Sequence, residues 1–319
     1  MNKVSIITPC YNSSLYIHRL LDSVLHQTYS NIEMFVVNDG STDNSQEIIN
    51  SYISKFEKKG YTLKCINQTN QGQGSAVNNG LKYITGEYLL WPDSDDFYAT
   101  SDAIERMVNV LDLNEDYAMV RTYAYVLDED SLFIKDEFGG KKYINKKHYL
   151  FEDCLFMQNN FWFGAGMYML RTSILFQNYP ERNYYVSNQY GGQNWQLLLP
   201  VLYKNKCFTI EKHLFNVLSR ANSHSRGTFK SIKKQIKKNE EHRNILLNTL
   251  DRIKIMQDAD KHKYKQLIYI KYEKILINLI LKYNKKEALE RLNLFRKEYK
   301  IRFSLKELLI FCYYLVAPK

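Results

Sequence analysis

The sequence predicts an α/β fold, a Rossmann-like and mostly parallel sheet with flanking helices, followed by a C-terminal basic α-helical region. In the first hundred residues, short β-rich runs alternate with amphipathic helical patterns, as right-handed crossovers in a parallel sheet require. The 319 residues are enough for about two folding units. Residues 1–225 carry a net charge of −4 and residues 226–319 one of +14, so we expect the boundary between the units at about residue 225.

The composition excludes several classes of protein. Hydrophobic residues make up 45% of the chain and charged residues 24%, which is ordinary for a soluble globular protein and untypical of a disordered chain or a membrane bundle. The five cysteines are widely spaced and form no CxxC pair, which argues against a zinc site or a redox dithiol and indicates reduced thiols. The apolar stretch at the start is too short for a secretory signal, so we expect a cytoplasmic protein.

The first two predicted strands each end in a polar turn. Val4–Thr8 has the pattern of a buried strand, residues 9–14 break it, and residues 17–25 have one apolar helical face. The second strand, Glu33–Asn38, leads directly to Asp39. N-cap oxygens for the helix that follows come from Ser41, Thr42 and Asp43.

Two further strands complete the pattern. A strand near Leu63–Ile66 is followed by the Gly-rich turn NQGQG and a helix that extends through Leu81. The fourth strand, Glu87–Trp91, leads into the sequence PDSDD. Because the carboxyl ends of parallel strands meet at one edge of a sheet, where ligands bind in open α/β folds, we expect these polar turns to line a binding site.

The carboxylates after the fourth strand favour a cation site. Clustered carboxylates repel one another and raise each other's pKa unless a cation lies between them. Asp93 and Asp95 stand two residues apart, which in extended chain points both side chains the same way and offers hard oxygen ligands to Mg²⁺ or Mn²⁺. An isolated DxD is more often a solvated turn with a helix cap, but the position after a core strand, next to a strand that ends in Asp39, favours the cation.

Asp39 and Tyr11 are candidate nucleotide contacts. A carboxylate at position 39 either caps a turn or accepts hydrogen bonds from a ribose or a base. Tyr11 offers a flat face for a base. The chain has no GxGxxG and no GxxxxGK[ST], which argues against a dinucleotide-binding fold and a P-loop.

Two segments, TPCYNSSLYIHRLLDSVLHQTYSNIEMFVVNDGSTDNS and NQGQGSAVNNGLKYITGEYLLWPDSDD, closely resemble the family 2 glycosyltransferases, which have the GT-A fold. The likeness is strong over residues 1–100, weaker to about residue 225, and absent from the basic region. The resemblance implies a nucleotide-diphosphate-sugar donor, most often UDP-linked. It also implies a hexosyltransferase-type reaction, a metal-dependent single displacement that inverts the anomeric carbon.

The resemblance also assigns site residues. Asp39 matches the acid that contacts the base, Asp93 matches a residue near the ribose and the metal, and Asp95 matches a metal ligand. Asn78 matches an asparagine beside which many relatives carry Arg, whereas this chain has Val77 and so one phosphate contact fewer. The family's first nucleotide-contacting loop is matched by Thr8, Pro9, Tyr11 and Asn12.

The position of the general base departs from the family pattern. Where relatives place an acidic pair at the start of a helix, this chain has Gln193 and Asn194, and an amide cannot accept the proton at neutral pH. Asp153, next to Glu152, is the substitute we consider first, although an acid there is also typical of a helix start. Asn194 and Trp195 are then candidates for orienting the acceptor.

The segment RANSHSRGT, residues 220–228, closes the acidic part of the chain. His224 is the candidate third metal ligand, because some metal-dependent relatives complete the cation site from this loop; a histidine in a Ser-rich loop is also often merely exposed. Arg220 and Arg226 are candidate partners of the diphosphate.

The basic region has a helical pattern and predicts three or four helices. Its apolar positions recur at intervals of three and four residues. The excess of Lys and Arg indicates an anionic membrane surface, a partner, or simply a solvated helical face. The uncharged run Leu308–Ala317 is half the length needed to span a bilayer. The positions on which the helical pattern rests are Ile245, Leu246, Thr249, Leu250, Ile253, Leu267, Ile270, Lys274, Ile277, Ile280 and Leu281.

The sequence leaves three hypotheses for the function. The leading one is an inverting, metal-dependent glycosyltransferase of polysaccharide biosynthesis, peripheral on the cytoplasmic membrane face, with a glycan or lipid-linked acceptor. The second is a catalytically silent nucleotide-sugar binding protein, which the amide at position 194 favours. The third, a nucleic-acid binder, leaves the carboxylates unexplained and lacks a recognition module, so we expect no nucleic acid as a partner.

Overall fold

A computed structural model describes residues 1–140, 148–184, 192–220 and 231–299. The chain divides into two compact units. The first contains Met1–Arg220 together with Arg252–Ile255, and the second contains Ala221–Asp251 together with Met256–Lys319. The boundary predicted at residue 225 lies outside the described residues.

The four predicted strands exist and are parallel. Their order in the sheet is β3-β2-β1-β4. Strand β1 pairs with β2 from Val4↔Ile32 to Cys10↔Asn38 and with β4 from Val4↔Tyr88 to Ile6↔Leu90. Strand β2 pairs with β3 on its other side. The bounds are Val4–Cys10 for β1, Ile32–Asp39 for β2, Thr62–Gln68 for β3 and Tyr88–Leu90 for β4.

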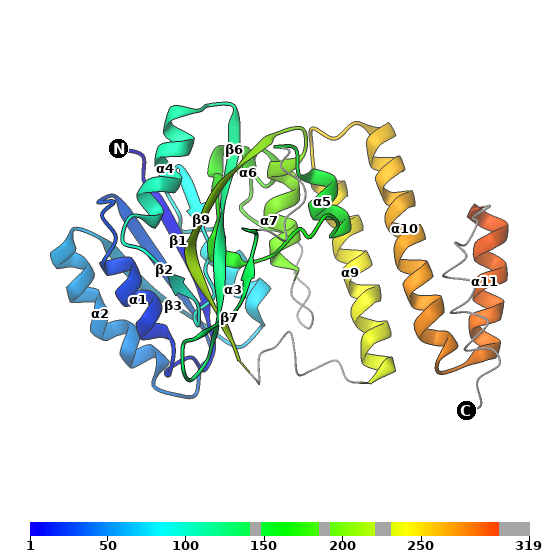
Figure 1. The fold of residues 1–319 in the computed structure, drawn as a ribbon, viewed down its shortest axis with the longest axis horizontal. Helices are drawn as coiled ribbons and strands as arrows, with labels where there is room; N and C mark the ends of the chain where they lie inside the picture. Colours follow the sequence, from blue (N-terminus) through cyan, green and yellow to red (C-terminus); the bar gives the residue numbers. More distant parts are fainter. Residues whose placement is uncertain (141–147, 185–191, 221–230, 300–319) are drawn as a thin grey trace. The chain divides into compact units, whose positions relative to one another are not determined.

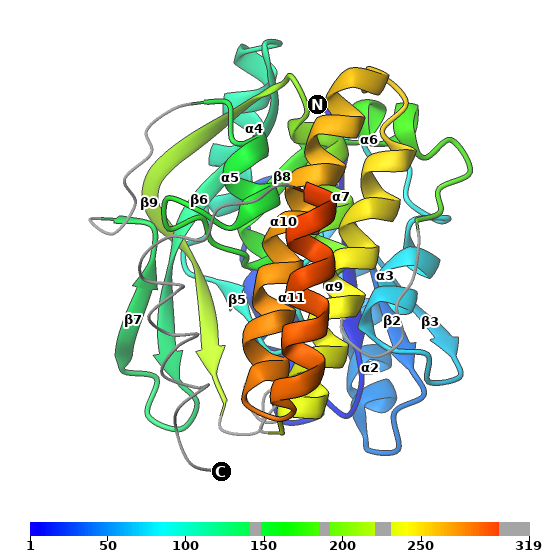
Figure 2. The same cartoon turned by 90° about the vertical axis from the view of Figure 1, so that its right-hand side faces the viewer.

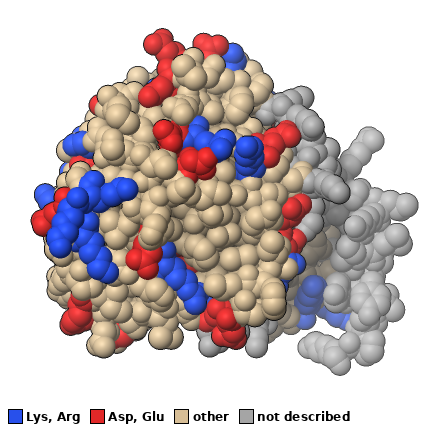
Figure 3. All heavy atoms as spheres, turned by 60° about the vertical axis from the view of Figure 1, so that its left-hand side comes forward, with Lys and Arg blue, Asp and Glu red and all other residues tan. Residues whose placement is uncertain are grey.

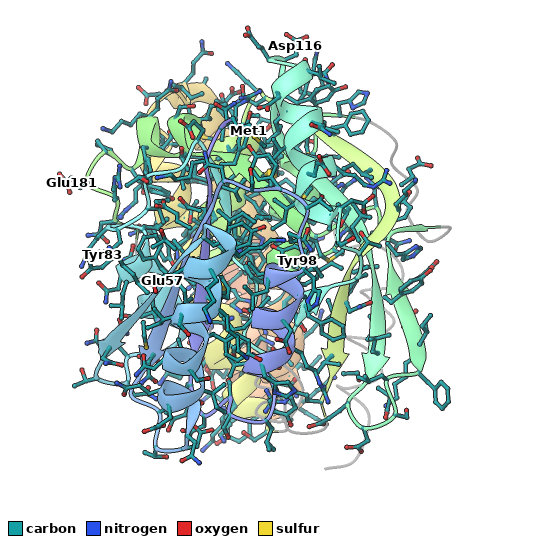
Figure 4. The ribbon with its side chains drawn as sticks, turned by 90° about the vertical axis from the view of Figure 1, so that its left-hand side faces the viewer. Met1, Glu57, Tyr83, Tyr98, Asp116 and Glu181 are labelled. Atoms are coloured by element: carbon teal, nitrogen blue, oxygen red, sulfur yellow. The ribbon has the colours of Figure 1, made fainter. Side chains whose placement is uncertain are left out.

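Five strands that the sequence analysis did not identify extend this sheet. Strand β8 is antiparallel to both β4 and β6, and β9 is parallel to β6. Strands β1 to β4, β6 and β9 therefore all run in one direction. Met1 and Asp116, which precede β1 and β6, accordingly lie near the same end of the sheet (Figure 4). The bounds are Phe97–Tyr98 for β5, Tyr117–Asp128 for β6, Ile134–Phe138 for β7, Tyr168–Arg171 for β8 and Lys206–Ser219 for β9.

Helices cover both faces of the sheet in the first unit. Helices α1 and α2 lie on one face and α3, α6 and α7 on the other (Figure 1). Their buried positions follow the predicted helical period: Ile17, Leu20, Leu21 and Val24 of α1 are all buried. The bounds are Ile17–Leu25 for α1, Ser45–Lys59 for α2, Gln73–Gly80 for α3, Ala103–Leu113 for α4, Phe151–Phe156 for α5, Ala165–Met167 for the 3₁₀ helix η2, Thr172–Asn178 for α6 and Gln193–Leu202 for α7.

One local prediction for the first unit was wrong, and another was confirmed for Asp43 alone. Strand β1 does not end at Thr8 but continues through Pro9 to Cys10. Proline is tolerated there because β4 pairs only with Val4–Ile6, so this end of β1 has a neighbouring strand on one side only. Helix α2 begins at Ser45, and no side chain caps it from Asn44; Asp43 instead accepts a 3.0 Å hydrogen bond from the Ser45 N–H.

The second unit contains three described helices, α9 (Ile232–Arg252), α10 (Asp258–Leu281) and α11 (Lys285–Tyr299), which lie side by side (Figure 2). The predicted apolar face of α9 is confirmed, since Ile245, Leu246, Thr249 and Leu250 are buried. For α10 the predicted face is partly wrong: Leu267 is 39% exposed and Ile268 is buried. The buried stripe uses the rings of Tyr264 and Tyr272, which a pattern of aliphatic residues alone does not mark.

A buried carboxylate joins these three helices. Glu273 of α10 accepts hydrogen bonds from Arg243 of α9 at 3.2 Å and from Arg291 of α11, whose Nη2 lies at 3.0 Å. An apolar cluster that includes Ile277, Ile280, Leu281, Ala288 and Phe295 packs α10 against α11. Within the described ranges, no helix is both long and apolar enough to cross a membrane.

Candidate active site

The carboxyl ends of six strands meet at one edge of the sheet and bring the predicted site residues together. Residues 11–16 follow β1, Asp39 ends β2, the Gly-rich turn follows β3, and Asp93–Asp96 follow β4. Glu129 follows β6 and Arg220 follows β9, which run in the same direction. The two late strands therefore deliver charged residues to an edge that the sequence analysis had assigned to the first four.

A pair of buried serines holds the carboxylate turn in place. The hydroxyls of Ser13 and Ser94 lie 2.7 Å apart and share a hydrogen bond. The Ser13 N–H donates to Ser45 Oγ at 2.8 Å, so the loop after β1, the start of α2 and the carboxylate turn are joined. The sequence analysis did not identify these serines, because a serine after a strand is common in turns of every kind.

The carboxylates form a turn and not the extended chain expected for Asp93 and Asp95. The Asp96 N–H donates to the Asp93 carbonyl oxygen at 3.2 Å, which closes the turn through Ser94 and Asp95. Each carboxylate then has a different partner. Asp93 accepts a hydrogen bond from the Gln73 amide of α3, Asp95 pairs with Arg220 at 2.8 Å, and Asp96 accepts from the Leu218 N–H of β9 at 2.9 Å.

The partners of Asp93, Asp95 and Asp96 do not fully neutralise the negative charge of these carboxylates. Burial, and after it the charge of Asp95, raise the pKa of Asp93 to about 7 against the smaller lowering effect of the Gln73 hydrogen bond. Burial, with the charges of Asp95 and Asp93, also holds the pKa of Asp96 well above its ordinary value. Hard carboxylate oxygens that destabilise one another fit a divalent cation. Within the described residues no cluster of three or more His, Cys, Asp and Glu side chains is arranged for a metal, and His224 and Arg226 lie outside them.

Asp39 is buried and organises the Gly-rich turn. Its carboxylate accepts hydrogen bonds at 2.8 Å from the Gln68 side chain, the Gln71 N–H and the Gly72 N–H. Both oxygens are thus used within the chain, and the turn that leads into α3 is shaped around them. The predicted contact between Asp39 and a base stays a prediction.

The residues of the predicted nucleotide loop have different surroundings. Thr8 and Pro9 are buried in β1, whereas the Tyr11 ring is 50% exposed beyond it. Asn12 has a positive φ of 47°, and its side-chain oxygen accepts a 2.8 Å hydrogen bond from the Thr42 N–H. Of the four, Tyr11 alone presents an open ring face at this edge.

Asn78 anchors the segment that precedes α7. Its side-chain oxygen accepts from the Tyr184 N–H at 2.9 Å, and its amide nitrogen donates to Asn183 Oδ1 at 2.8 Å. The Tyr184 hydroxyl in turn donates to the Gly74 carbonyl oxygen at 2.7 Å. Asn78 thereby ties α3 to the chain at 183–184. Its predicted donor contact stays a prediction.

The residues predicted for base and acceptor are held by packing contacts. Asn194 accepts a 2.8 Å hydrogen bond from the Trp91 indole N–H. Trp195 is 7% exposed and donates to the Cys154 carbonyl oxygen at 3.0 Å, so its ring lies between α5 and α7. Asp153 is buried on α5 and accepts from Asn159 at 2.8 Å. The proposed roles of these three residues in the reaction remain predictions.

Arg220 lies between two acidic residues of this edge, Asp95 and Glu129. Besides its pair with Asp95, its Nε lies 3.9 Å from Glu129 Oε1 and its guanidinium carbon lies 4.3 Å from the centre of the Tyr16 ring. The Tyr16 hydroxyl donates to Glu129. Tyr16 and Glu129 were not predicted from the sequence. A signal for Glu129 would have been its position after a long β-rich run, 117–128.

The comparison with protein families identifies the first unit. The family model described as Glycosyl transferase family 2 matches residues 5–176, more than half of the chain. The chain belongs to this family. The family resemblance stated from the sequence is therefore confirmed, and the matched residues contain the strands that carry Asp39 and Asp93–Asp96.

Curated relatives support the same membership over a shorter stretch. The glycosyltransferase GlyA of Streptococcus pneumoniae is 34% identical over 148 residues, which cover 45% of this chain and 20% of that protein. An uncharacterized glycosyltransferase of Haemophilus influenzae is 41% identical over 111 residues, 35% of this chain and 43% of that protein. The match thus spans less than half the length of each of these relatives.

Solved structures confirm the GT-A fold. Residues 1–349 of TarS of S. aureus, in complex with UDP-GlcNAc, superpose with a TM-score of 0.60 at 18% identity, covering 98% of this chain and 79% of that one. The mannosyltransferase PcManGT of Pyrobaculum calidifontis, in complex with GDP-Man and Mn²⁺, gives a TM-score of 0.56 at 14% identity, over 98% and 79%. The structural likeness covers nearly the whole chain, whereas the match to the family model ends at residue 176.

Proposed function

We propose that the chain transfers a sugar, with inversion, from a UDP-linked donor to a glycan or lipid-linked acceptor in polysaccharide biosynthesis. The observation that carries this proposal is the carboxylate turn Asp93–Asp96. It lies at the carboxyl edge of a parallel sheet and is held by the loop after β1, by α3 and by β9. Family membership supports the class of reaction. The complexes of two solved neighbours with nucleotide sugars support the class of donor.

A divalent cation belongs to this proposal, and Asp93 and Asp95 would hold it, with His224 as the proposed third ligand. The support is the chemistry of the turn, where burial and, after it, the nearby Asp95 carboxylate raise the pKa of Asp93. Bound there, Mg²⁺ or Mn²⁺ supplies Lewis-acid stabilisation of the negative charge on the departing diphosphate. The presence of Mn²⁺ in the PcManGT structure is consistent with this choice of ion.

The chain's own residues divide the remaining work. Tyr11 offers its exposed ring to the base, and Asp39 holds the Gly-rich turn against which the nucleoside lies. Asn78 fixes α3 and the segment at 183–184 in one position, which keeps this part of the proposed donor site rigid. Rigid placement of the donor lowers the entropic cost of reaching the transition state.

An inverting transfer also requires a base on the face of the sugar opposite the diphosphate. Asp153 is our proposed base, and Asn194 and Trp195 are proposed to orient the acceptor through the contact between α5 and α7. One observation favours a second function. Asn194 stands where relatives have an acid, and its side-chain oxygen accepts a hydrogen bond from the Trp91 indole N–H. A nucleotide-sugar binding protein without transferase activity would have this arrangement.

One experiment tests the proposal and separates the two functions. The melting temperature is measured with UDP-, GDP- and dTDP-sugars and Mn²⁺, and release of UDP is then followed with glycan acceptors, with and without EDTA. We expect UDP-sugars to raise the melting temperature, and EDTA or Asp95→Asn to reduce turnover by at least about a hundredfold. Asp116→Asn, on the exposed surface, is the control and should leave turnover unchanged.

Stabilisation by UDP-sugars with no transfer to any acceptor would favour the binding protein. Turnover that survives both EDTA and Asp95→Asn would contradict the proposed chemistry.

We further propose that the basic second unit contacts an anionic membrane surface on the cytoplasmic face. The support is the net charge of +14 of residues 226–319, against −4 for residues 1–225. On the side of the first unit that carries α1 and α2, both signs of charge are interspersed (Figure 3). Helix α9 in contrast begins with the exposed lysines Lys233, Lys234 and Lys237.

Vesicles with anionic lipid test this location. Replacing Lys233, Lys234 and Lys237 with Gln should weaken sedimentation with the vesicles at least tenfold, since each basic residue near the surface contributes about 1 kcal/mol. The matched control replaces Lys55, Lys58 and Lys59, three exposed lysines of α2. Equal loss in both triple variants would indicate a general charge effect and contradict a specific surface.

A further inference from the structure

Arg220 connects the carboxylate turn to a second acidic group. Its Nη1 lies 2.8 Å from Asp95 Oδ2, and its Nε lies 3.9 Å from Glu129 Oε1, beyond hydrogen-bond distance. The guanidinium also stacks over the ring of Tyr16, whose hydroxyl donates to Glu129. Residues after β4 and after β6 and a residue of the loop before α1 therefore all lie around the guanidinium of Arg220, which itself follows β9.

Arg220 is hydrogen-bonded through Nη1 but not through Nε. Burial lowers the pKa of Arg220, but the hydrogen bond and charge of Asp95 outweigh this and raise it above its ordinary value. Its Nε is buried and has no hydrogen-bond partner among the described residues. Leaving a buried charged donor without an acceptor costs free energy. An anionic oxygen that accepted a hydrogen bond from Nε would therefore stabilise the guanidinium.

Asp95 is a candidate partner for two positive groups, the proposed cation and Arg220. Asp95 is a proposed cation ligand, and its Oδ2 accepts a hydrogen bond from Arg220 Nη1. A carboxylate oxygen that donates electron density to a divalent ion cannot keep a guanidinium at 2.8 Å without placing two positive centres against each other. Binding of the ion at Asp95 Oδ2 and pairing of this oxygen with Arg220 therefore oppose each other.

We propose that Arg220 is the resident counter-charge of Asp95: it neutralises this carboxylate before the cation binds, competes with the cation for it, and transfers to the donor diphosphate once displaced. The inference rests on the proposed function and assigns Arg220 a positioning role within it. Its released fork of N–H groups, including the unsatisfied Nε, suits bidentate binding of phosphate oxygens. Cation and nucleotide then help each other to bind, because the cation frees Arg220 for the phosphates and the phosphates keep Arg220 away from Asp95.

Isothermal titration with Mn²⁺, alone and in the presence of UDP, tests this competition. The proteins are the wild type, Arg220→Gln, Arg220→Lys, Asp95→Asn and the control Arg106→Gln, which removes an ion pair with Asp102 on the surface of α4. Circular dichroism checks that each variant is folded. A partly exposed ion pair limits the effect to about a fivefold change in Kd.

We expect Arg220→Gln to bind Mn²⁺ alone about fivefold more tightly than the wild type and to gain less from added UDP. Arg220→Lys should lie between the two, and Arg106→Gln should match the wild type. Unchanged or weaker Mn²⁺ binding by Arg220→Gln would overturn the inference while leaving the proposed function standing. No Asp95-dependent Mn²⁺ binding in any of the proteins would overturn the cation step of the proposed function and this inference together.

A crystal structure with Mn²⁺ provides an independent measurement. An anomalous manganese peak at Asp95 together with an Arg220–Asp95 separation well beyond 2.8 Å is the expected result. The same peak with the ion pair intact would contradict the competition, even if the affinities had changed through long-range charge alone.

Discussion

The indole N–H of Trp91 donates a 2.8 Å hydrogen bond to the side-chain oxygen of Asn194. Trp91 is buried directly after β4, two residues before Asp93, and Asn194 lies in the first turn of α7. The bond therefore ties the start of α7 to the segment that carries the carboxylate turn. An amide at position 194 has a structural task that does not depend on accepting a proton.

Asn194→Ala should lower the free energy of unfolding by about 1–2 kcal/mol, because it leaves the buried indole N–H of Trp91 without an acceptor. Asn194→Asp keeps an acceptor oxygen and adds a negative charge at a helix N-terminus, so its stability should stay within about 0.5 kcal/mol of the wild type. Urea unfolding followed by Trp fluorescence measures both. Equal losses in the two variants would show that the hydrogen bond is not the cause.

The contact between α3 and β1 makes a matched pair of glycine substitutions informative. A Cβ built at Gly80 would lie 2.6 Å from Ile7 Cγ2, whereas one built at Gly74 meets nothing within 4 Å. Gly80→Ala should therefore cost about 1–3 kcal/mol through overpacking, and Gly74→Ala should be neutral or stabilising by up to about 1 kcal/mol. Thermal unfolding of both variants tests this, and a Gly80→Ala protein as stable as the wild type would contradict the close approach.

Glu33 predicts an acid-dependent part of the stability. Burial alone would raise its pKa, but hydrogen bonds from Ser5, at 2.6 Å, and from Thr85, together with the charge of Lys3, lower it below 4.5. Because the folded state has the lower pKa, this stabilisation is present above pH 4.5 and is lost as the pH falls through the folded value.

The melting temperature of Glu33→Gln should accordingly lie below that of the wild type at pH 7, and the difference should shrink as the pH is lowered below 4.5. Scanning calorimetry from pH 7 to pH 3 provides the measurement. A difference that is constant over this range would mean that the ionised form of Glu33 contributes nothing.

The second unit depends on a buried charge between two arginines. Removing one member of a buried ion pair leaves the others uncompensated, so Glu273→Gln should destabilise α9, α10 and α11 by about 3 kcal/mol. Glu290→Gln, at an exposed position of α11, is the matched control and should cost less than about 0.5 kcal/mol. Amide hydrogen exchange of the three helices reports the loss directly. Protection that is equal in both variants would contradict the role given to Glu273.

Local patterns were sufficient where each strand is joined to the next by a single helix. Strands β1 to β4 pair in parallel through short crossovers, so their periodicity and their polar ends predicted both the sheet and the edge where Asp39 and Asp93 lie. Helix α9 likewise buries the face that its apolar period indicates.

The same patterns failed where distant segments decide the local conformation. The conformation of Asp93–Asp96 is a turn because Ser13 and the β9 backbone hold it from outside, and neither contact has a signal within the four residues themselves. The long strands β6 and β9 were not recognised, so the approach of Arg220 to both Asp95 and Glu129 was not predicted either.

By itself, the sequence determined the parallel half of the sheet, the edge that carries the carboxylates, the family, and the helical nature of the basic region. All of these follow from periodicity and from motifs that are continuous in the chain. Only the tertiary structure decided which charge faces which carboxylate: Arg220 reaches Asp95 across 125 residues of chain. Such a pairing depends on the order and direction of strands in the sheet, and no spacing within the sequence encodes these.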